Sequence, residues 1–270
     1  MDETELASLM AQAIDAVTDD ARAQWAEPQG TRTRHFFVDD LLPADLAAQV
    51  QAAFPRDAEI WHHRRSFREH KLTCTRLAAV DPLIRATSSA FQQPAVLEAV
   101  RRITGLDGLQ ADPTLYASGL SMMARGHFLN PHIDNSHDGR RERYRRLNLL
   151  YYVSPDWSAA SGGNFELWDA AVRRPVEIVS RFNRLLVMET RPDTWHSVNP
   201  VRGAAPRCCV SNYYFSSQSP TGSDYYHVTS FLGRPGQPLR RLLGRLDNGS
   251  RQAVARITGA GRGRRLLNDA

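Results

Sequence analysis

The sequence predicts an α+β fold, with a double-stranded β-helix (jelly-roll) core and a helical N-terminal half packed against it. Up to about residue 111, apolar residues recur at intervals of three and four, which is typical of amphipathic helices. From about residue 112, short apolar and alternating runs between turn residues replace them, as in a barrel or sandwich of short strands. We therefore expect a helical support region at 1–111, a jelly-roll core at 112–232 and a basic tail at 233–270.

The N-terminal half is expected to hold four helices and one short strand. Apolar spacing predicts a helix over residues 3–25, and the sequence Glu27-Pro28-Gln29-Gly30 ends it. A strand is expected at 35–38, followed by a helix that opens at Pro43. Asp81 and Pro82 form a helix start, an N-cap followed by proline at the first helical position, and a further helix runs from Pro94 to Gly105.

The C-terminal half is expected to hold the strands of the jelly roll. Turn signals at 161–163 and 191–193 separate apolar runs of strand length. The predicted strands cover residues 147–153, 164–168, 176–180, 184–189 and 208–215.

Composition sets limits on compartment and partners. There are 34 basic and 29 acidic residues, so the net charge of +5 leaves room for an anionic substrate without indicating nucleic acid. Cys74, Cys208 and Cys209 are too few and too poorly spaced for a disulfide framework or a zinc site. The acidic start lacks the pattern of a signal peptide, and no apolar run approaches the roughly 18 residues that span a membrane. A soluble, cytoplasmic protein is expected.

A short motif in the core predicts a metal site. Strand alternation places His132 and Asp134 on one face, so both can bind the same ion while Ile133 packs on the other side. His196, just past a turn that follows a predicted apolar strand, can complete a set of two histidines and one carboxylate. This set leaves half of an octahedral ion open, which is what a non-haem Fe(II) oxygenase requires.

Four segments surround and extend this motif in a fixed order. They are residues 126–134, 148–157, 162–168 and 196–207, which carry Gly126 before the triplet, an apolar strand, the Gly162-Gly163 pair and a distal histidine followed by Arg207. Together they resemble the Fe(II)/2-oxoglutarate-dependent oxygenases of the prolyl 4-hydroxylase-like superfamily. The resemblance covers roughly residues 112–216, and a weaker likeness at 37–55 extends it.

The resemblance implies the cofactors and the residues that bind them. His132, Asp134 and His196 are the expected iron ligands, and Arg207 the expected partner of the distal carboxylate of 2-oxoglutarate. Arginine suits this task because its planar, permanently charged fork can bind a carboxylate through two hydrogen bonds. No catalytic residue beyond the metal ligands is expected. The implied cofactors are Fe(II), 2-oxoglutarate and O2, with ascorbate as a candidate reductant.

Tyr152 and Asn148 are further candidates for the cosubstrate pocket. Tyr152 occupies a position where relatives often use tyrosine to bind the same carboxylate, and Asn148 shares its strand face by even spacing. The chain departs from its relatives at two positions: Met123 stands where they commonly have tyrosine, and Cys209 where some have serine.

The implied reaction is hydroxylation of an unactivated C–H bond in a peptidyl residue, as in prolyl hydroxylases, or in a small metabolite, with release of succinate and CO2. Asp134 favours hydroxylation, because related halogenases lack this carboxylate. Two alternatives stay open: a nucleic acid demethylase or repair oxygenase on the same fold, and a non-catalytic jelly-roll binding module. The expected partner is a peptide or small-molecule substrate, and neither a membrane nor nucleic acid is expected.

Two arginine-rich segments were assigned roles from their positions. The loop at 138–146 lies between the ligand triplet and the next strand, so Arg140, Arg141 and Arg143 are candidates to orient an anionic substrate. The tail from 233 lacks the interleaved aromatic residues that would stack bases. We expect it to be a disordered segment or an arm that contacts a partner.

Overall fold

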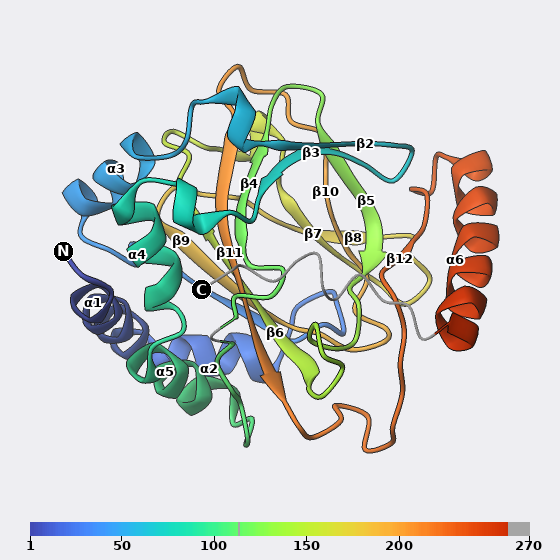
Figure 1. Ribbon diagram of the computed structural model, residues 1–270, viewed down its shortest axis with the longest axis horizontal. Helices are drawn as coiled ribbons and strands as arrows, with labels where there is room; N and C mark the ends of the chain where they lie inside the picture. The colour runs from blue at the N-terminus through green and yellow to red at the C-terminus, as the bar shows by residue number, and fades with distance from the viewer. Residues whose placement is uncertain (113, 259–270) are drawn as a thin grey trace.

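The computed structural model describes residues 1–112 and 114–258, with the backbone alone for 252–258. This part of the chain contains six α-helices and twelve strands (Figure 1). The helices are α1 (Glu3–Ala16), α2 (Thr18–Ala26), α3 (Ala44–Ala52), α4 (Pro82–Ala90), α5 (Pro94–Thr104) and α6 (Pro238–Thr258). The strands are β1 (His35–Val38), β2 (His62–Arg65), β3 (Glu69–Cys74), β4 (Gly119–Met123), β5 (Phe128–Ile133), β6 (Tyr144–Tyr152), β7 (Phe165–Trp168), β8 (Pro175–Ile178), β9 (Arg184–Glu189), β10 (His196–Val198), β11 (Arg207–Ser216) and β12 (Ser230–Phe231).

The strands form one curled antiparallel sheet. Its order is β1-β9-β6-β11-β4-β3-β5-β10-β7-β8, with β12 paired to β5 and β2 paired to β3. Strand β3 pairs with β4 on one side and with β5 on the other, so it joins the two halves of the sheet. The predicted jelly-roll core and the helices packed against it are both present, which confirms the expected fold class.

Alternation along β6 separates two apolar cores. Leu147, Leu149 and Tyr151 face the helices and belong to the larger buried cluster, which includes residues of α1 to α5. Leu150 and Tyr152 point the other way, into a second cluster enclosed by the curled sheet. In Figure 1, α1, α3, α4 and α5 gather on one side of the sheet, and α6 lies at the opposite side. The helices therefore brace one face of the sheet and leave its concave face for a site.

Local signals place the ends of most helices correctly. The Asp81 carboxylate accepts a hydrogen bond from the backbone of Leu83 at the start of α4, and Gly105 ends α5 with φ of 63°. The helix predicted over 3–25 is instead two helices, because the backbone of Val17 leaves the helical region between α1 and α2.

Two regions differ from the expected division of the chain. The segment at 1–111 supplies β2 and β3 to the sheet, in addition to its helices and the expected strand β1. The tail is helical rather than irregular over α6, while residues 259–270, with the arginines at 262, 264 and 265, lie outside the described residues. Within the described chain, no helix is both long enough and apolar enough to cross a membrane.

Candidate active site

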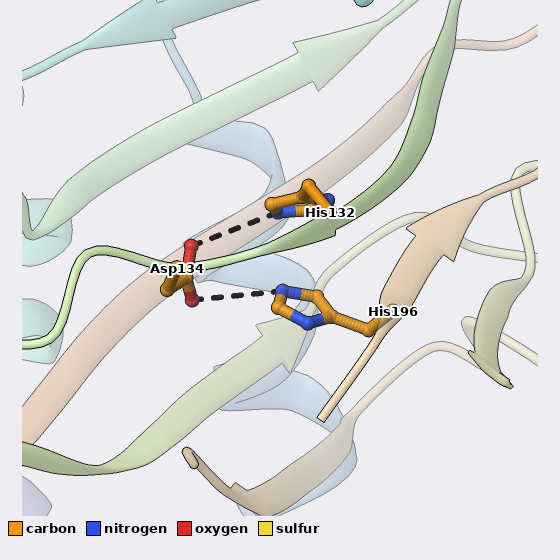
Figure 2. A group of neighbouring side chains, drawn as sticks. All are labelled: His132, Asp134 and His196. Atoms are coloured by element: carbon orange, nitrogen blue, oxygen red, sulfur yellow. Dashed lines mark ion pairs between the residues drawn. The ribbon is translucent and has the colours of Figure 1, made fainter. Parts of the chain in front are cut away.

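Three neighbouring strands position the predicted metal ligands. Strands β5 and β10 pair antiparallel with His196 directly opposite His132, and Asp134 follows the end of β5. On the other side of β5, Phe231 of β12 lies opposite His132 and stacks on its ring at 5.2 Å between centroids. Figure 2 shows the two imidazole rings and the carboxylate converging on one point. The cross-strand pairing thus brings together residues 64 positions apart in the sequence.

The side-chain geometry leaves the ligand atoms facing one another. One Asp134 oxygen lies 3.6 Å from Nε2 of His132, and the other lies 3.5 Å from Nε2 of His196 (Figure 2). The ligand atoms of these three residues all lie within 4.8 Å of one another, as the ligands of one ion do. Each histidine places Nδ1 3.1 Å from a backbone carbonyl, that of Asn130 or Thr194. A proton on Nδ1 donates to this carbonyl, so the lone pair on Nε2 points to the metal position.

Burial sets the charge state of the three residues. Desolvation, with a smaller effect of His196, lowers the pKa of His132 to about 3, and desolvation also lowers the pKa of His196. Burial alone would raise the pKa of Asp134, but His196, Arg145, His132 and the hydrogen bond from Asn148 outweigh it and hold this pKa well below its usual range. Two neutral imidazoles and an ionised carboxylate are the forms that bind a divalent cation.

Two side chains of β6 contact Asp134. The amide of Asn148 donates to Asp134 over 2.6 Å, and a guanidinium nitrogen of Arg145 lies 3.6 Å from the same carboxylate oxygen. Asn148, predicted for the cosubstrate pocket, therefore contacts the metal side of the site. Arg145 is a site residue that no motif in the sequence marks; it is buried, and its guanidinium lies 3.9 Å from the ring centre of Tyr213.

Arg207 lies in the same cavity as the metal set, and its side chain is buried. Its Nε donates to Ser180 over 2.9 Å, its guanidinium lies 4.8 Å from the Tyr152 ring centre, and one terminal nitrogen lies 3.9 Å from the sulfur of Met123. Among the described residues it has no carboxylate partner. The hydroxyl of Tyr152 is also buried beside Arg207 and Ser180, and it makes no hydrogen bond of good geometry in the described chain. A buried cation beside a hydroxyl that can still donate forms a receptor for an anion.

The Gly162-Gly163 pair makes room for this arginine. Gly163 has φ of 62°, and a Cβ there would lie 3.0 Å from Cδ of Arg207 and 3.0 Å from Trp157. Its carbonyl accepts a hydrogen bond from Ser180, the residue that holds Nε of Arg207. In the sequence, Ser180 is only the last residue of a predicted strand, and nothing there marks it as a site residue.

The cavity that contains both groups has a volume of about 1760 Å³. Arg140 and Arg141 line it, as the sequence analysis expected, but Arg143 does not. Arg143 instead pairs with Asp138 at 2.7 Å and with Asp112 at 3.1 Å. The structure therefore does not bring Arg143 to the cavity with the other two arginines, because two carboxylates bind its guanidinium.

A curled jelly roll that places two histidines and an aspartate beside a buried arginine has the donor set typical of the non-haem iron oxygenases. Residues 118–215 match the family model of the 2OG-Fe(II) oxygenase superfamily. The match includes the metal set and Arg207. None of the curated proteins matches the chain.

Solved structures of the same class share the fold. A Trichoplax adhaerens prolyl hydroxylase in complex with a hypoxia inducible factor peptide has a TM-score of 0.56 and 16% identity, over 79% of this chain and 96% of that chain. A Pseudomonas putida prolyl-4-hydroxylase has a TM-score of 0.54 and 18% identity, over 77% and 98%. The α-ketoglutarate-dependent epimerase SnoN of nogalamycin biosynthesis has a TM-score of 0.51 and 14% identity, over 77% and 87%. At these identities, the likeness shows the fold alone.

Proposed function

We propose that this protein is an Fe(II)- and 2-oxoglutarate-dependent dioxygenase. Its reaction is hydroxylation of an unactivated C–H bond in a peptidyl residue or a small metabolite, with release of succinate and CO2. One observation carries the proposal: a two-histidine, one-carboxylate set and a buried arginine without an acidic partner in the described chain face the same cavity. A non-catalytic module that binds an anion could use the arginine, but it would have no use for an open set of metal ligands in the same cavity.

The metal ligands in this proposal are His132, Asp134 and His196. When bound, Fe(II) with 2-oxoglutarate and O2 supplies the oxidising chemistry, for which the protein has no side chain of its own. The protein's contribution is to fix the ligands: backbone carbonyls orient both imidazoles, and Asn148 holds the carboxylate. His132, Asp134 and His196 all line the cavity, so they would hold the ion where cosubstrate and substrate can reach it.

Arg207 and Tyr152 bind the distal carboxylate of 2-oxoglutarate in this proposal. Ser180 occupies Nε of Arg207, so the two terminal nitrogens are directed to the ligand. The hydroxyl of Tyr152, which burial keeps protonated by raising its pKa, can donate a further hydrogen bond. Because both groups are already desolvated before the ligand enters, the ion pair forms without loss of their hydration.

The substrate class is supported only broadly by the structural neighbours. One of them is a prolyl hydroxylase bound to a peptide fragment, and another is an epimerase of nogalamycin biosynthesis. A cavity of about 1760 Å³ is larger than the roughly 300–1,000 Å³ usual for small-molecule sites, so it has room for cosubstrate and substrate together.

Succinate formation tests the proposal. The protein is prepared anaerobically with Fe(II), and succinate released from 2-oxoglutarate is measured on exposure to air, with and without peptide and metabolite candidates. We expect slow succinate release without substrate, and none from His132→Ala. Binding of 2-oxoglutarate is measured separately by calorimetry with Zn(II) in place of iron.

Two variants separate the cofactor roles. Arg207→Ala is expected to bind Zn(II) like the wild type but to lose 2-oxoglutarate, and His132→Ala is expected to lose the metal. A wild-type protein that binds neither Fe(II) nor 2-oxoglutarate would overturn the assignment.

A further inference from the structure

The wall of the active-site cavity carries an excess of cations even without the residues assigned to iron and 2-oxoglutarate. The basic residues on the wall are Arg64, Lys71, Arg140, Arg141, Arg145 and Arg251, and the acidic ones are Glu69, Asp138 and Glu142. They come from the β2–β3 hairpin, the loop between β5 and β6, the start of β6 itself and α6. Segments far apart in the sequence therefore contribute the same sign of charge to one cavity.

The acidic residues of the wall do not neutralise this excess. Glu69 lies 3.3 Å from Lys71 and 4.0 Å from Arg64, so one carboxylate serves two cations. Asp138 forms an ion pair with Arg143, which does not line the cavity. Arg145 lies 3.6 Å from Asp134 and Arg251 lies 3.9 Å from Asp247, so the excess that remains comes from Arg140, Arg141 and the two cations that share Glu69. A cavity wall with such an excess attracts anions from solution.

Arg141 is the wall cation whose geometry most clearly indicates a ligand. Its guanidinium lies 4.2 Å from the ring centre of Tyr226, which also lines the cavity. One terminal nitrogen, Nη2, is buried without a hydrogen-bond partner in the described chain. Its backbone has φ of 62°, a conformation that costs free energy for a residue with a side chain and is concentrated at functional sites.

The loop that carries Arg141 is held in place before any ligand binds. Asp138 accepts a hydrogen bond from the backbone of Glu142 at 3.0 Å and one from Nε of Arg143 at 2.7 Å. Arg143 in turn pairs with the fully buried Asp112 at 3.1 Å and donates to the carbonyl of Ala111 at 3.1 Å. Arg143 thus fixes the loop on its outer side, while Arg140 and Arg141 face the cavity. Such preorganisation favours affinity for a small charged group.

We propose that the substrate carries an acid group, a carboxylate, phosphate or sulfate, and that Arg141 on the Tyr226 ring binds this group while Arg140 attracts it to the entrance. This proposal rests on the proposed function, since it assigns the substrate class of the same cavity. The oxidised C–H bond then lies on the part of the substrate between the Arg141 site and the metal set. A neutral analogue, such as the corresponding amide or alcohol, binds poorly.

Calorimetry with inorganic anions tests the site. The full chain is saturated with Zn(II) and 2-oxoglutarate, so that the metal set and Arg207 are occupied. Potassium phosphate, sulfate and acetate are then titrated in turn at constant ionic strength, which separates tetrahedral anions from carboxylates. We expect binding of at least one anion, weakened about tenfold or more in Arg141→Gln because a charge-assisted hydrogen bond is lost, and weakened less in Arg141→Lys.

Arg173→Gln is the matched control. It removes the same charge from an exposed loop between β7 and β8, outside the cavity wall, and should bind the anion as the wild type does. The titration is repeated in Arg207→Ala without Zn(II) or 2-oxoglutarate, so the anion site can be detected even if the oxygenase assignment fails. If the wild type binds none of the three anions, or if Arg141→Gln and Arg173→Gln bind them equally, the proposal is wrong.

Discussion

At the scale of single residues, the site depends on how each buried charge is compensated. Arg207 and Arg184 are both buried arginines of the sheet, but only Arg184 has a carboxylate partner, since it donates to both oxygens of Asp39 at 2.6 and 2.8 Å. Desolvation of a charge costs free energy that a partner offsets. The free protein therefore bears a cost at Arg207 that bound 2-oxoglutarate removes.

Because only one of the two arginines has a carboxylate partner, replacing each with methionine should change the free energy of unfolding differently. Arg207→Met should leave the free energy of unfolding of the cofactor-free protein unchanged or raise it by about 1 kcal/mol, because no buried carboxylate is left behind. Arg184→Met should lower it by about 1–2 kcal/mol, because Asp39 loses two hydrogen bonds and keeps only the exposed Arg181 as an ion-pair partner. Urea unfolding of both variants measures the effect. In the same assay, 2-oxoglutarate with Zn(II) should stabilise the wild type and not Arg207→Met. Equal destabilisation by both substitutions would contradict the argument.

Asn148 and Tyr152 share a strand face but belong to different halves of the site. Asn148→Ala removes the hydrogen bond to Asp134 and should weaken metal binding about 10–100-fold, as loss of such an outer contact usually does. Tyr152→Phe, four residues along the strand, should weaken 2-oxoglutarate binding and leave metal affinity unchanged. Competition with a chelating Zn(II) indicator measures the first quantity and calorimetry the second. Metal affinity that falls equally in both variants would show that β6 acts on the site only through general stability.

At the scale of elements, a β-bulge in β6 explains why the sequence predicts Asn148 and Tyr152 as site residues but not Arg145. Along β6 and β11, Tyr214 pairs with Leu147 and Phe215 with Arg145, so Arg146 is an extra residue in the ladder. This bulge reverses the alternation and turns Arg145 to the same side as Asn148. Even spacing in the sequence predicts that Asn148 and Tyr152 share a face. It cannot predict that Arg145 joins them, because the bulge forms only when β6 pairs with β11.

The remaining differences have the same origin in long-range contacts. His132, Asp134, His196 and Arg207 could be predicted because local strand patterns and short motifs carry them. Ser180 reaches Arg207 only through the curl of the sheet, and β3 joins two strands that lie 45 or more residues further along the chain. The arginines of the tail were assigned by composition, which does not reveal that one of them forms a buried ion pair with β7.

The ion pair between Arg234 and Glu166 connects the segment after β12 to β7, the strand that pairs with β10 of the metal site. Arg234 donates to both oxygens of Glu166 at 2.9 and 2.6 Å, and Ser197, next to His196, donates to the same carboxylate. Glu166 is only 3% exposed. Arg234→Ala leaves this carboxylate unpaired, so we expect a loss of about 2–4 kcal/mol in the free energy of unfolding.

The double variant Glu166→Gln with Arg234→Met tests whether the loss comes from the unpaired charge. It should recover more than half of the stability, because a neutral pair of similar size replaces the ion pair. Limited proteolysis should cleave the segment that follows β12 faster in Arg234→Ala than in the double variant. Equal loss of stability in both would assign the effect to packing of the arginine on Trp168 instead.

At the scale of the whole molecule, histidines link folding to pH. Burial is the main cause that lowers the pKa of five buried or half-buried histidines: His35, His132, His137, His196 and His227. The unfolded chain binds protons at these positions near pH 6.5, whereas the folded chain does so only at lower pH. The unfolded state therefore binds more protons below pH 6.5, and stability must fall as pH falls.

The size of this effect can be bounded from His132. With a folded pKa of about 3 and an unfolded value of 6.5, this residue alone lowers the free energy of unfolding by about 1.4 kcal/mol between pH 7.5 and 5.5. Urea unfolding of the metal-free protein at the two pH values should show at least this loss. His35→Phe, remote from the metal set, should reduce the slope without changing metal affinity. Zn(II) should steepen it, because protons and metal compete for the same Nε2 atoms of His132 and His196. A metal-free protein equally stable at both pH values would mean that these rings are solvated in the folded state, and the preformed neutral ligand set would then not exist.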